Sequence, residues 1–263
     1  MKHLHRWTVC ATAMALSIAA QSQDKARLTF EVASVKPAKS GGRGGGIRPM
    51  PGGQTYNATN APLRLMIKLI YKITDSQIIG GPKWMNDDLW DVEAKAERPS
   101  NLDQLHEMFQ NLLADRFGLR FHRETREIQA YVLSVDKSGS KMKVSEGQDP
   151  YDIPIKGGGP GKIVGTRVPM SYLCWYLSQP FDLPVVDKTS LAGFYDFTIE
   201  IPMPPPPPPG ARPEDGRGGG IGIQDAQVLV LGAVREQLGL KLDSRKMPVE
   251  VFVIDHAEKP GVN

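Results

Sequence analysis

One pattern occurs twice in this chain, and it constrains the fold more than any other sequence feature. The late copy covers residues 234–242 and 248–255, and the early copy covers residues 113–121 and 129–136. In both copies a helical pattern runs into a glycine, and two apolar segments follow with a polar segment between them. Glycine readily ends a helix, and a polar segment between two strand patterns is typical of a turn. Each copy therefore predicts a helix followed by a hairpin.

The similarity extends upstream at a nearly constant spacing. Six residues between positions 52 and 84 match residues 107 positions further on, among them Pro62 with Pro169. The repeat unit is about 105 to 120 residues long, whereas solenoid repeats have periods of roughly 20 to 50 residues. We therefore expect a duplicated domain, with a first repeat in residues 28–148 and a second repeat in residues 149–263.

The period of the apolar residues predicts the class of fold. Helical patterns cover residues 61–73, 100–117, 169–178 and 226–238, and strand patterns lie between them. We expect an α+β fold of two duplicated domains, each with two helices packed on a small mixed or antiparallel sheet. Asn60 is expected to cap the first helix, because asparagine is favoured at that position.

Two segments rich in glycine or proline interrupt these patterns. Residues 40–53 are expected to form a mobile loop, because they contain too few apolar side chains to offset the entropy of ordering. Residues 202–222 form a Pro/Gly-rich insertion in the second repeat, and residues 204–209 are six consecutive prolines. Such a run adopts an extended polyproline II helix, so we expect a stiff surface spacer.

The first 22 residues have the layout of a secretory signal peptide. Lys2 and Arg6 precede an apolar run over residues 8–20, and small residues follow it. This run is too short to span a membrane as a helix. We expect removal of residues 1–22, a periplasmic or secreted protein, and no stable membrane span afterwards. The remaining chain is nearly neutral, which argues against nucleic-acid binding because that requires a clustered basic surface.

Residues that could carry chemistry are few. Once residues 1–22 are removed, the histidines are His106, His122 and His256, and their spacing matches no metal-binding motif. Each is expected at the surface or at an edge. Cys174 lies in an apolar helical pattern and is expected to be buried and unreactive. The sequence identifies no catalytic, cofactor-binding or metal-binding set.

A basic strip is the one candidate site that the sequence offers. Arg64, Lys68 and Lys72 recur every four residues in the pattern of residues 61–73, so they fall on one side of that helix. The strip can be a solvated edge that needs no function, or it can bind a partner. Trp84 and Trp90 likewise suit either an aromatic cleft or packing.

Several short motifs occur between residue 28 and the end of the chain. They are FEVASVKP at 30–37, GGPKW at 80–84, LLADRF at 112–117, VVDKT at 185–189, QLGLKL at 237–242, and PVEV to IDH at 248–256. As a set they resemble a soil-associated family of secreted proteins of unknown function that is abundant in acidobacteria. This resemblance implies a location and a fold but no mechanism.

Each half also resembles the short N-terminal domain of secretins and TonB-dependent receptors. The shared pattern is a Pro-Leu pair that opens a helix, two strands, a second helix that ends in Gly-Leu, and a final strand. This resemblance implies a small α+β domain that engages other envelope proteins.

Two functions are compatible with these observations. The first is a non-catalytic extracytoplasmic binding or protein-interaction module with an envelope or secreted protein partner, because the chain shows duplication, an export signal and no catalytic set. The alternative is a cell-envelope hydrolase that uses Asp187, Asp255 or His256, which requires these groups to converge within hydrogen-bonding distance.

Overall fold

The residues that the computed structural model describes are 27–39, 45–147, 151, 153–202 and 223–261. The predicted signal peptide and nearly all of the Pro/Gly-rich insertion lie outside these residues. Among the described helices, none is long and apolar enough to cross a membrane.

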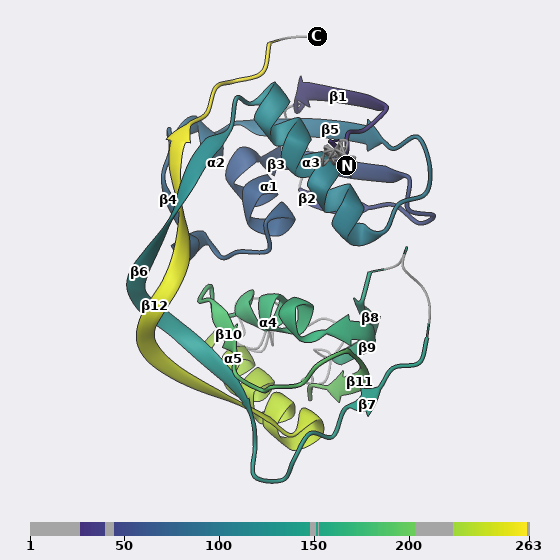
Figure 1. The fold of residues 1–263 in the computed structure, drawn as a ribbon, viewed down its shortest axis with the longest axis vertical. Helices are drawn as coiled ribbons and strands as arrows, with labels where there is room; N and C mark the ends of the chain where they lie inside the picture. The colour runs from purple at the N-terminus through teal and green to yellow at the C-terminus, as the bar shows by residue number, and fades with distance from the viewer. Residues whose placement is uncertain (1–26, 40–44, 148–150, 152, 203–222, 262–263) are drawn as a thin grey trace, which may run out of the picture.

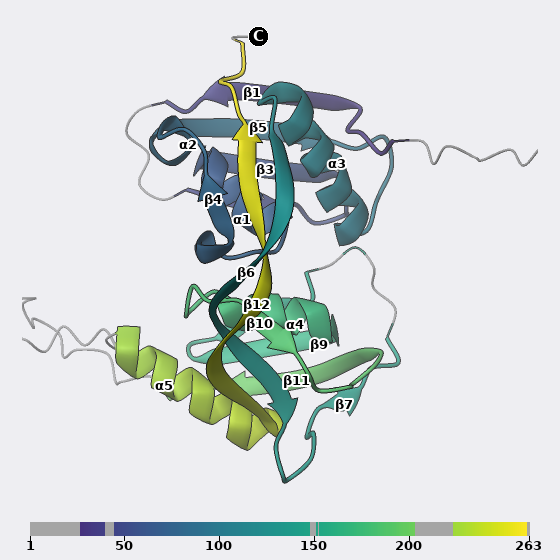
Figure 2. The same ribbon diagram turned by 60° about the vertical axis from the view of Figure 1, so that its left-hand side comes forward.

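Two lobes are joined by a long, twisted ribbon of two strands (Figure 1). The ribbon consists of β6 (Arg120–Val135) and β12 (Leu240–His256), which pair antiparallel along their length. Seen from a second direction, the ribbon still runs alongside both lobes (Figure 2). The described residues form three four-stranded sheets and five α-helices, so the fold is mixed α and β and contains more strand than the sequence predicted.

The first lobe contains an antiparallel sheet in the order β1-β5-β3-β2. In β5, Trp90, Val92 and Ala94 are buried, because alternate side chains of a strand point to the same face. They share a core with Phe109 and Phe117. The elements of this lobe are β1 (Val32–Pro37), β2 (Gly46–Pro49), β3 (Thr55–Pro62), α1 (Leu63–Ile70), α2 (Trp84–Asp87), β5 (Leu89–Lys95) and α3 (Leu102–Arg116).

The second lobe contains a sheet in the order β7-β11-β9-β8. Its core includes Leu173 and Leu177 of helix α4, and Val234 and Leu238 of the turn that follows helix α5. The elements are β7 (Lys143–Val144), β8 (Ile155–Gly159), β9 (Lys162–Pro169), α4 (Met170–Ser178), β11 (Phe194–Glu200) and α5 (Ile223–Ala233), which continues as a π-helical turn over Val234–Leu238. Gly239 follows that turn with a φ of 68°, the left-handed conformation that glycine adopts most easily.

The ribbon contributes to both lobes. Toward its C-terminal end, β12 pairs in parallel with β4 (Ile78–Gly80), and Phe252 lies in the core of the first lobe. Toward its own C-terminal end, β6 pairs in parallel with β10 (Val185–Asp187), and Leu133 lies in the core of the second lobe. Each predicted repeat therefore supplies a strand that completes the packing of the other lobe.

The two predicted hairpins are wrong. The segments 120–135 and 240–256 are each one uninterrupted strand, and their partner is the other segment. The polar residues 123–127, predicted as a turn, lie in the middle of β6 with mostly exposed side chains. A polar segment is equally suited to a turn and to a strand that faces solvent, so the pattern could not separate the two.

Two local predictions also fail. Asn60 does not cap α1; it lies in β3 with a φ of 46°, and Pro62 stands at the N-cap without a side-chain hydrogen bond. Part of the predicted loop 40–53 is the strand β2, because residues 46–49 pair with β3. The position of helix α3 was predicted well, and the side chain of Asn101 caps its N-terminus.

Candidate functional site

A cavity of about 240 Å³ lies where the two lobes meet, and we call it the junction cleft. The first lobe contributes residues at the end of α1 and the start of α3, and the second lobe contributes residues around the start of α4 and on β11. The lining residues are Lys72, Asn101, Leu102, Asp103, Pro154, Arg167, Pro169, Ser171, Tyr172 and Phe194. Three of these side chains are charged and two are aromatic, so the cleft can contact both the polar and the apolar parts of a ligand.

Two residues of the basic strip bind Asp75 close to the contact between the lobes, and one of them, Lys68, reaches the second lobe. Asp75 accepts hydrogen bonds from Arg64 Nε at 3.0 Å and from Lys68 Nζ at 2.9 Å. Burial raises the pKa of Asp75, but the hydrogen bonds and charges of Lys68 and Arg64 outweigh burial and leave that pKa below its usual value. Lys68 Nζ also lies 3.6 Å from a carboxylate oxygen of Asp182 in the second lobe. Partner binding by this strip stays a prediction.

The third residue of the strip reaches the cleft itself. Lys72 Nζ donates to Asp103 Oδ1 at 2.8 Å, and it lies 5.7 Å from the ring centroid of Tyr172. The hydrogen bond from Lys72 lowers the pKa of Asp103. Burial raises the pKa of the Tyr172 phenol, so this group is neutral at physiological pH. The ammonium of Lys72 thus connects an acid of the first lobe with an aromatic ring of the second.

A buried polar pair lies close to this contact. The Tyr56 hydroxyl and His106 Nε2 are 3.0 Å apart, and His106 is only 6% exposed. Burial and the charge of Lys72 lower the pKa of His106 to about 3, so its ring is neutral. Among the described residues, His106 Nδ1 has no hydrogen-bond partner. The prediction that His106 lies at the surface or an edge is wrong, because this side of α3 faces the core with Leu105 and Phe109.

Arg167 is the second cation of the cleft and the sequence did not single it out. Its φ is 50°, and its backbone N–H donates to Asp196 Oδ1 at 2.7 Å. Its guanidinium carbon lies 4.1 Å from the ring centroid of Phe194, and Nη1 donates to the carbonyl oxygen of Gly147. Asn60 stands 107 positions earlier, so comparing the two repeats residue by residue would have drawn attention to this arginine.

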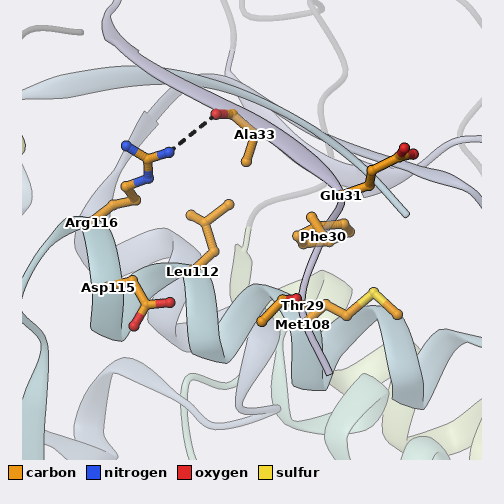
Figure 3. Close-up of a pocket in the computed structure, with 8 residues that line it drawn as sticks. All are labelled: Thr29, Phe30, Glu31, Ala33, Met108, Leu112, Asp115 and Arg116. Carbon is orange, nitrogen blue, oxygen red and sulfur yellow. Dashed lines mark hydrogen bonds between the residues drawn. The ribbon is translucent and has the colours of Figure 1, made fainter. Parts of the chain in front are cut away.

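Other hollows on the described surface are less suited to a ligand. Between α3 and β1 lies a groove of about 150 Å³, and Figure 3 shows Arg116 reaching across it to the carbonyl oxygen of Ala33 at 3.5 Å. An apolar cavity of about 360 Å³ lies between α4, α5 and the second sheet, and its lining offers few polar groups that could orient a ligand. A hollow of about 610 Å³ at the β8–β9 turn borders Pro202, where the described chain stops.

The residues of the alternative hydrolase do not converge. Asp187 binds the backbone and hydroxyl of Thr189, and it pairs with Leu133 on the ribbon. Asp255 lies near the far end of the ribbon, so roughly 40 Å of strand, at about 3.3 Å per residue, separates the two carboxylates. His256 Nε2 lies 3.7 Å from Glu258 Oε2, and among the described residues it forms no hydrogen bond or ion pair with either aspartate.

Asp255 instead contacts another histidine. His122 Nδ1 lies 2.8 Å from Asp255 Oδ1, and Nε2 lies 3.0 Å from Glu124 Oε1. Hydrogen bonds to Glu124 and Asp255 raise the pKa of His122. In the described part of the chain no serine, threonine or cysteine hydrogen-bonds to this histidine, and no three His, Cys, Asp or Glu side chains form a group that could hold a metal ion. This surface cluster is therefore an ion-pair network without a nucleophile.

The prediction for Cys174 is confirmed. Its side chain is buried in α4, and burial raises the pKa of the thiol to about 12. A thiol is nucleophilic only as the thiolate, so this cysteine is unreactive in the folded protein.

Comparison with known proteins identifies the family. A family described as protein of unknown function (DUF3738) matches residues 64–257, which is most of the chain. The chain therefore belongs to this uncharacterised family. No curated protein and no solved structure matched it.

Proposed function

We propose that the protein is a non-catalytic binding module whose ligand or partner occupies the junction cleft. The observation that carries this proposal is the position of the cleft. It lies between the lobes and is lined by charged and aromatic side chains from both of them. Ligand sites occur preferentially at such interfaces, where a few polar groups orient a bound molecule.

The proposal includes a place and a type of partner. The sequence of residues 1–22 supports export, so the module works in the periplasm or outside the cell and contacts an envelope or secreted protein. The resemblance to a soil-associated secreted family, and that of each half to the short N-terminal domain of secretins and TonB-dependent receptors, support the same setting. The cleft at the junction supplies the surface on which such a partner would bind.

We also propose that the two lobes descend from one duplicated unit. Val185 lies opposite Tyr131 in the second lobe, and Ile78 lies opposite Phe252 in the first. Both α1 and α4 start after a proline in nearly the same conformation, with ψ values of 152° and 151°. A duplicated unit explains why one cleft lies at the contact between two lobes of similar build.

Position-dependent crosslinking tests the proposed function. A photoreactive amino acid replaces Ser171, which is exposed and lines the cleft, and a control variant carries it at Lys246, which is exposed on the ribbon outside the cleft. In cells that export the protein, the Ser171 variant is expected to form a defined adduct that the Lys246 variant does not form. Equal adducts from both positions would contradict the proposal, and no adduct from Ser171 would contradict a protein partner in the cleft.

A further inference from the structure

We propose that the junction cleft binds a carboxylate group of its ligand, and that Arg167 is the residue that recognises it. This inference rests on the proposed function, because it names the ligand chemistry of the same cleft. It is carried by the charges in the cleft, by the backbone conformation of Arg167 and by the aromatic rings beside it.

The charges of the cleft leave one cation without an acidic partner. Of the three charged lining residues, Lys72 and Asp103 form an ion pair of 2.8 Å. Within the described residues Arg167 forms no ion pair, and its one side-chain hydrogen bond goes to the carbonyl oxygen of Gly147. A guanidinium carries five N–H donors in a planar fork, and this geometry matches a carboxylate. Most of these donors therefore remain for a ligand.

The backbone of Arg167 is costly for an arginine. Arg167 and Asn60 both have a left-handed φ, 50° and 46°, and both donate their backbone N–H to an aspartate, at 2.7 Å from Asp196 and at 2.9 Å from Asp91. Asparagine adopts this region several times more often than most residues do. In the first lobe, Asn60 suits this backbone conformation. In the second lobe, Arg167 adopts it only with strain. Strain of this kind is typical of residues with a function, and here the side chain that lines the cleft supplies one.

The aromatic rings define the rest of the ligand. The guanidinium lies over the ring of Phe194, and the ring of Tyr172 lies beside Lys72 Nζ in the same cleft. The cleft of about 240 Å³ is slightly smaller than the roughly 300 to 1,000 Å³ of sites for drug-sized ligands. It can hold a small organic acid with a flat apolar part, or the carboxylate end of a longer peptide. Both ligands share the carboxylate, and the experiment separates them.

Calorimetric titration of the full chain with two matched pairs of probes tests the inference. The first pair is benzoate and benzamide, and the second is acetyl-Ala-Ala-Phe with a free carboxylate and with a C-terminal amide. We expect at least one acid to bind at least about tenfold more tightly than its amide, because the amide forms no charge-assisted hydrogen bond with Arg167. If only the peptide acid binds, the ligand is a peptide terminus. If benzoate binds as tightly as the peptide acid, the ligand is a free organic acid.

Variants of the two left-handed positions supply the controls. Arg167→Asn is expected to weaken binding of the acid at least about tenfold, while its Tm equals that of the wild type or rises by up to roughly 3 °C because the backbone strain is relieved. Asn60→Arg places an arginine on the matching backbone of the first lobe and is expected to lower the Tm without changing affinity. The inference is overturned if Arg167→Asn binds the acid as the wild type does, if amides bind as tightly as acids, or if Arg167→Asn lowers the Tm as much as Asn60→Arg.

Crosslinking and titration together separate the two proposals. A defined adduct from Ser171 with no preference for carboxylates would overturn this inference and leave the proposed function standing. Absence of both the adduct and the binding would overturn both.

Discussion

Phe252 of β12 stacks on Phe121 of β6, with ring centroids 4.5 Å apart and ring planes inclined by 16°. Tyr71, which follows α1, meets both rings edge-on at 5.1 and 5.4 Å. Phe252 comes from the last strand of the chain, yet it is 3% exposed in the core of the first lobe. The first lobe therefore depends on the C-terminal strand for its packing.

Truncation of this ring is expected to destabilise the whole protein. Phe252→Ala should lower the free energy of unfolding by about 3 to 5 kcal/mol, because it removes a buried aromatic side chain and leaves a cavity. Urea unfolding followed by tryptophan fluorescence measures this free energy of unfolding. The fluorescence reports on the first lobe, because Trp84 and Trp90 both contact Phe117 there. Val144→Ala, at a residue that is 72% exposed, should change the free energy by less than about 0.5 kcal/mol. Equal effects of the two substitutions would show that β12 does not complete the first lobe.

The ion pairs of Asp75 with the basic strip are expected to stabilise the segment of the first lobe that contacts Asp182 of the second lobe. Asp75→Asn keeps the shape of the side chain but leaves Arg64 and Lys68 without their carboxylate, and Lys68 is only 15% exposed. We expect a loss of about 1 to 2 kcal/mol, a modest value because the Asp75 side chain itself is 40% exposed.

A matched exposed pair serves as the control for Asp75. Asp115→Asn removes the carboxylate that pairs with Arg27, and both of those side chains are about half exposed. Its effect in the same chemical denaturation should be close to zero. If Asp75→Asn costs no more than Asp115→Asn, the ion pairs of Asp75 with the strip do not stabilise the fold, and a partner could bind Arg64 and Lys68 instead.

The buried histidine predicts a specific sensitivity to acid. His106 has a pKa of about 3 in the folded protein and about 6.5 when unfolded, so between these values only the unfolded chain takes up the proton. The stability that comes from burying the neutral imidazole is fully present above pH 6.5 and is lost as the pH falls toward 3. The slope is roughly 1.4 kcal/mol per pH unit for one proton. Comparing wild type with His106→Gln by urea unfolding at several pH values isolates this effect, because Lys72, Asp103 and Tyr56 are present in both proteins.

The difference between the two stability curves should change as the pH is lowered from 6.5 to 4. The wild type should lose stability relative to His106→Gln across that interval, and the difference should be constant above pH 7. Parallel curves would mean that the imidazole is accessible to protons in the folded state.

Local features of the fold could be predicted from the sequence, and long-range pairings could not. Helix α3 was predicted because its apolar residues recur with the helical period and Gly118 follows it. The partner of β6 was not, because an alternating pattern shows that a segment is a strand but does not show which strand it pairs with. Without that pairing, nothing indicated that Phe252 belongs to the first lobe.

The candidate site was predicted only in part, for a similar reason. The helical pattern predicted that Lys72 lies inside the helix, but α1 ends at Ile70 and Lys72 has a left-handed φ of 55°. Its contacts with Asp103 and Tyr172 depend on how the helix ends and on how the two lobes meet. His106 lies one position after Leu105 on the buried side of α3, so the apolar period could have indicated its burial. The unusual feature of Arg167 is its φ of 50°, which no composition or spacing reveals.

Thermal unfolding tests most directly whether the junction cleft is the binding site. The Tm of the wild type and of Ser171→Trp, which fills the cleft with a large side chain, is measured in the presence of each compound of a panel. The panel contains peptides with free carboxylates, cell-wall fragments, nucleotides and neutral sugars. A ligand at a hundredfold its Kd adds about 2.7 kcal/mol of stability. Binding in the junction cleft predicts that carboxylate-bearing compounds raise the Tm of the wild type and not that of Ser171→Trp. A panel that leaves the wild type unchanged, or that shifts both proteins equally, would contradict it.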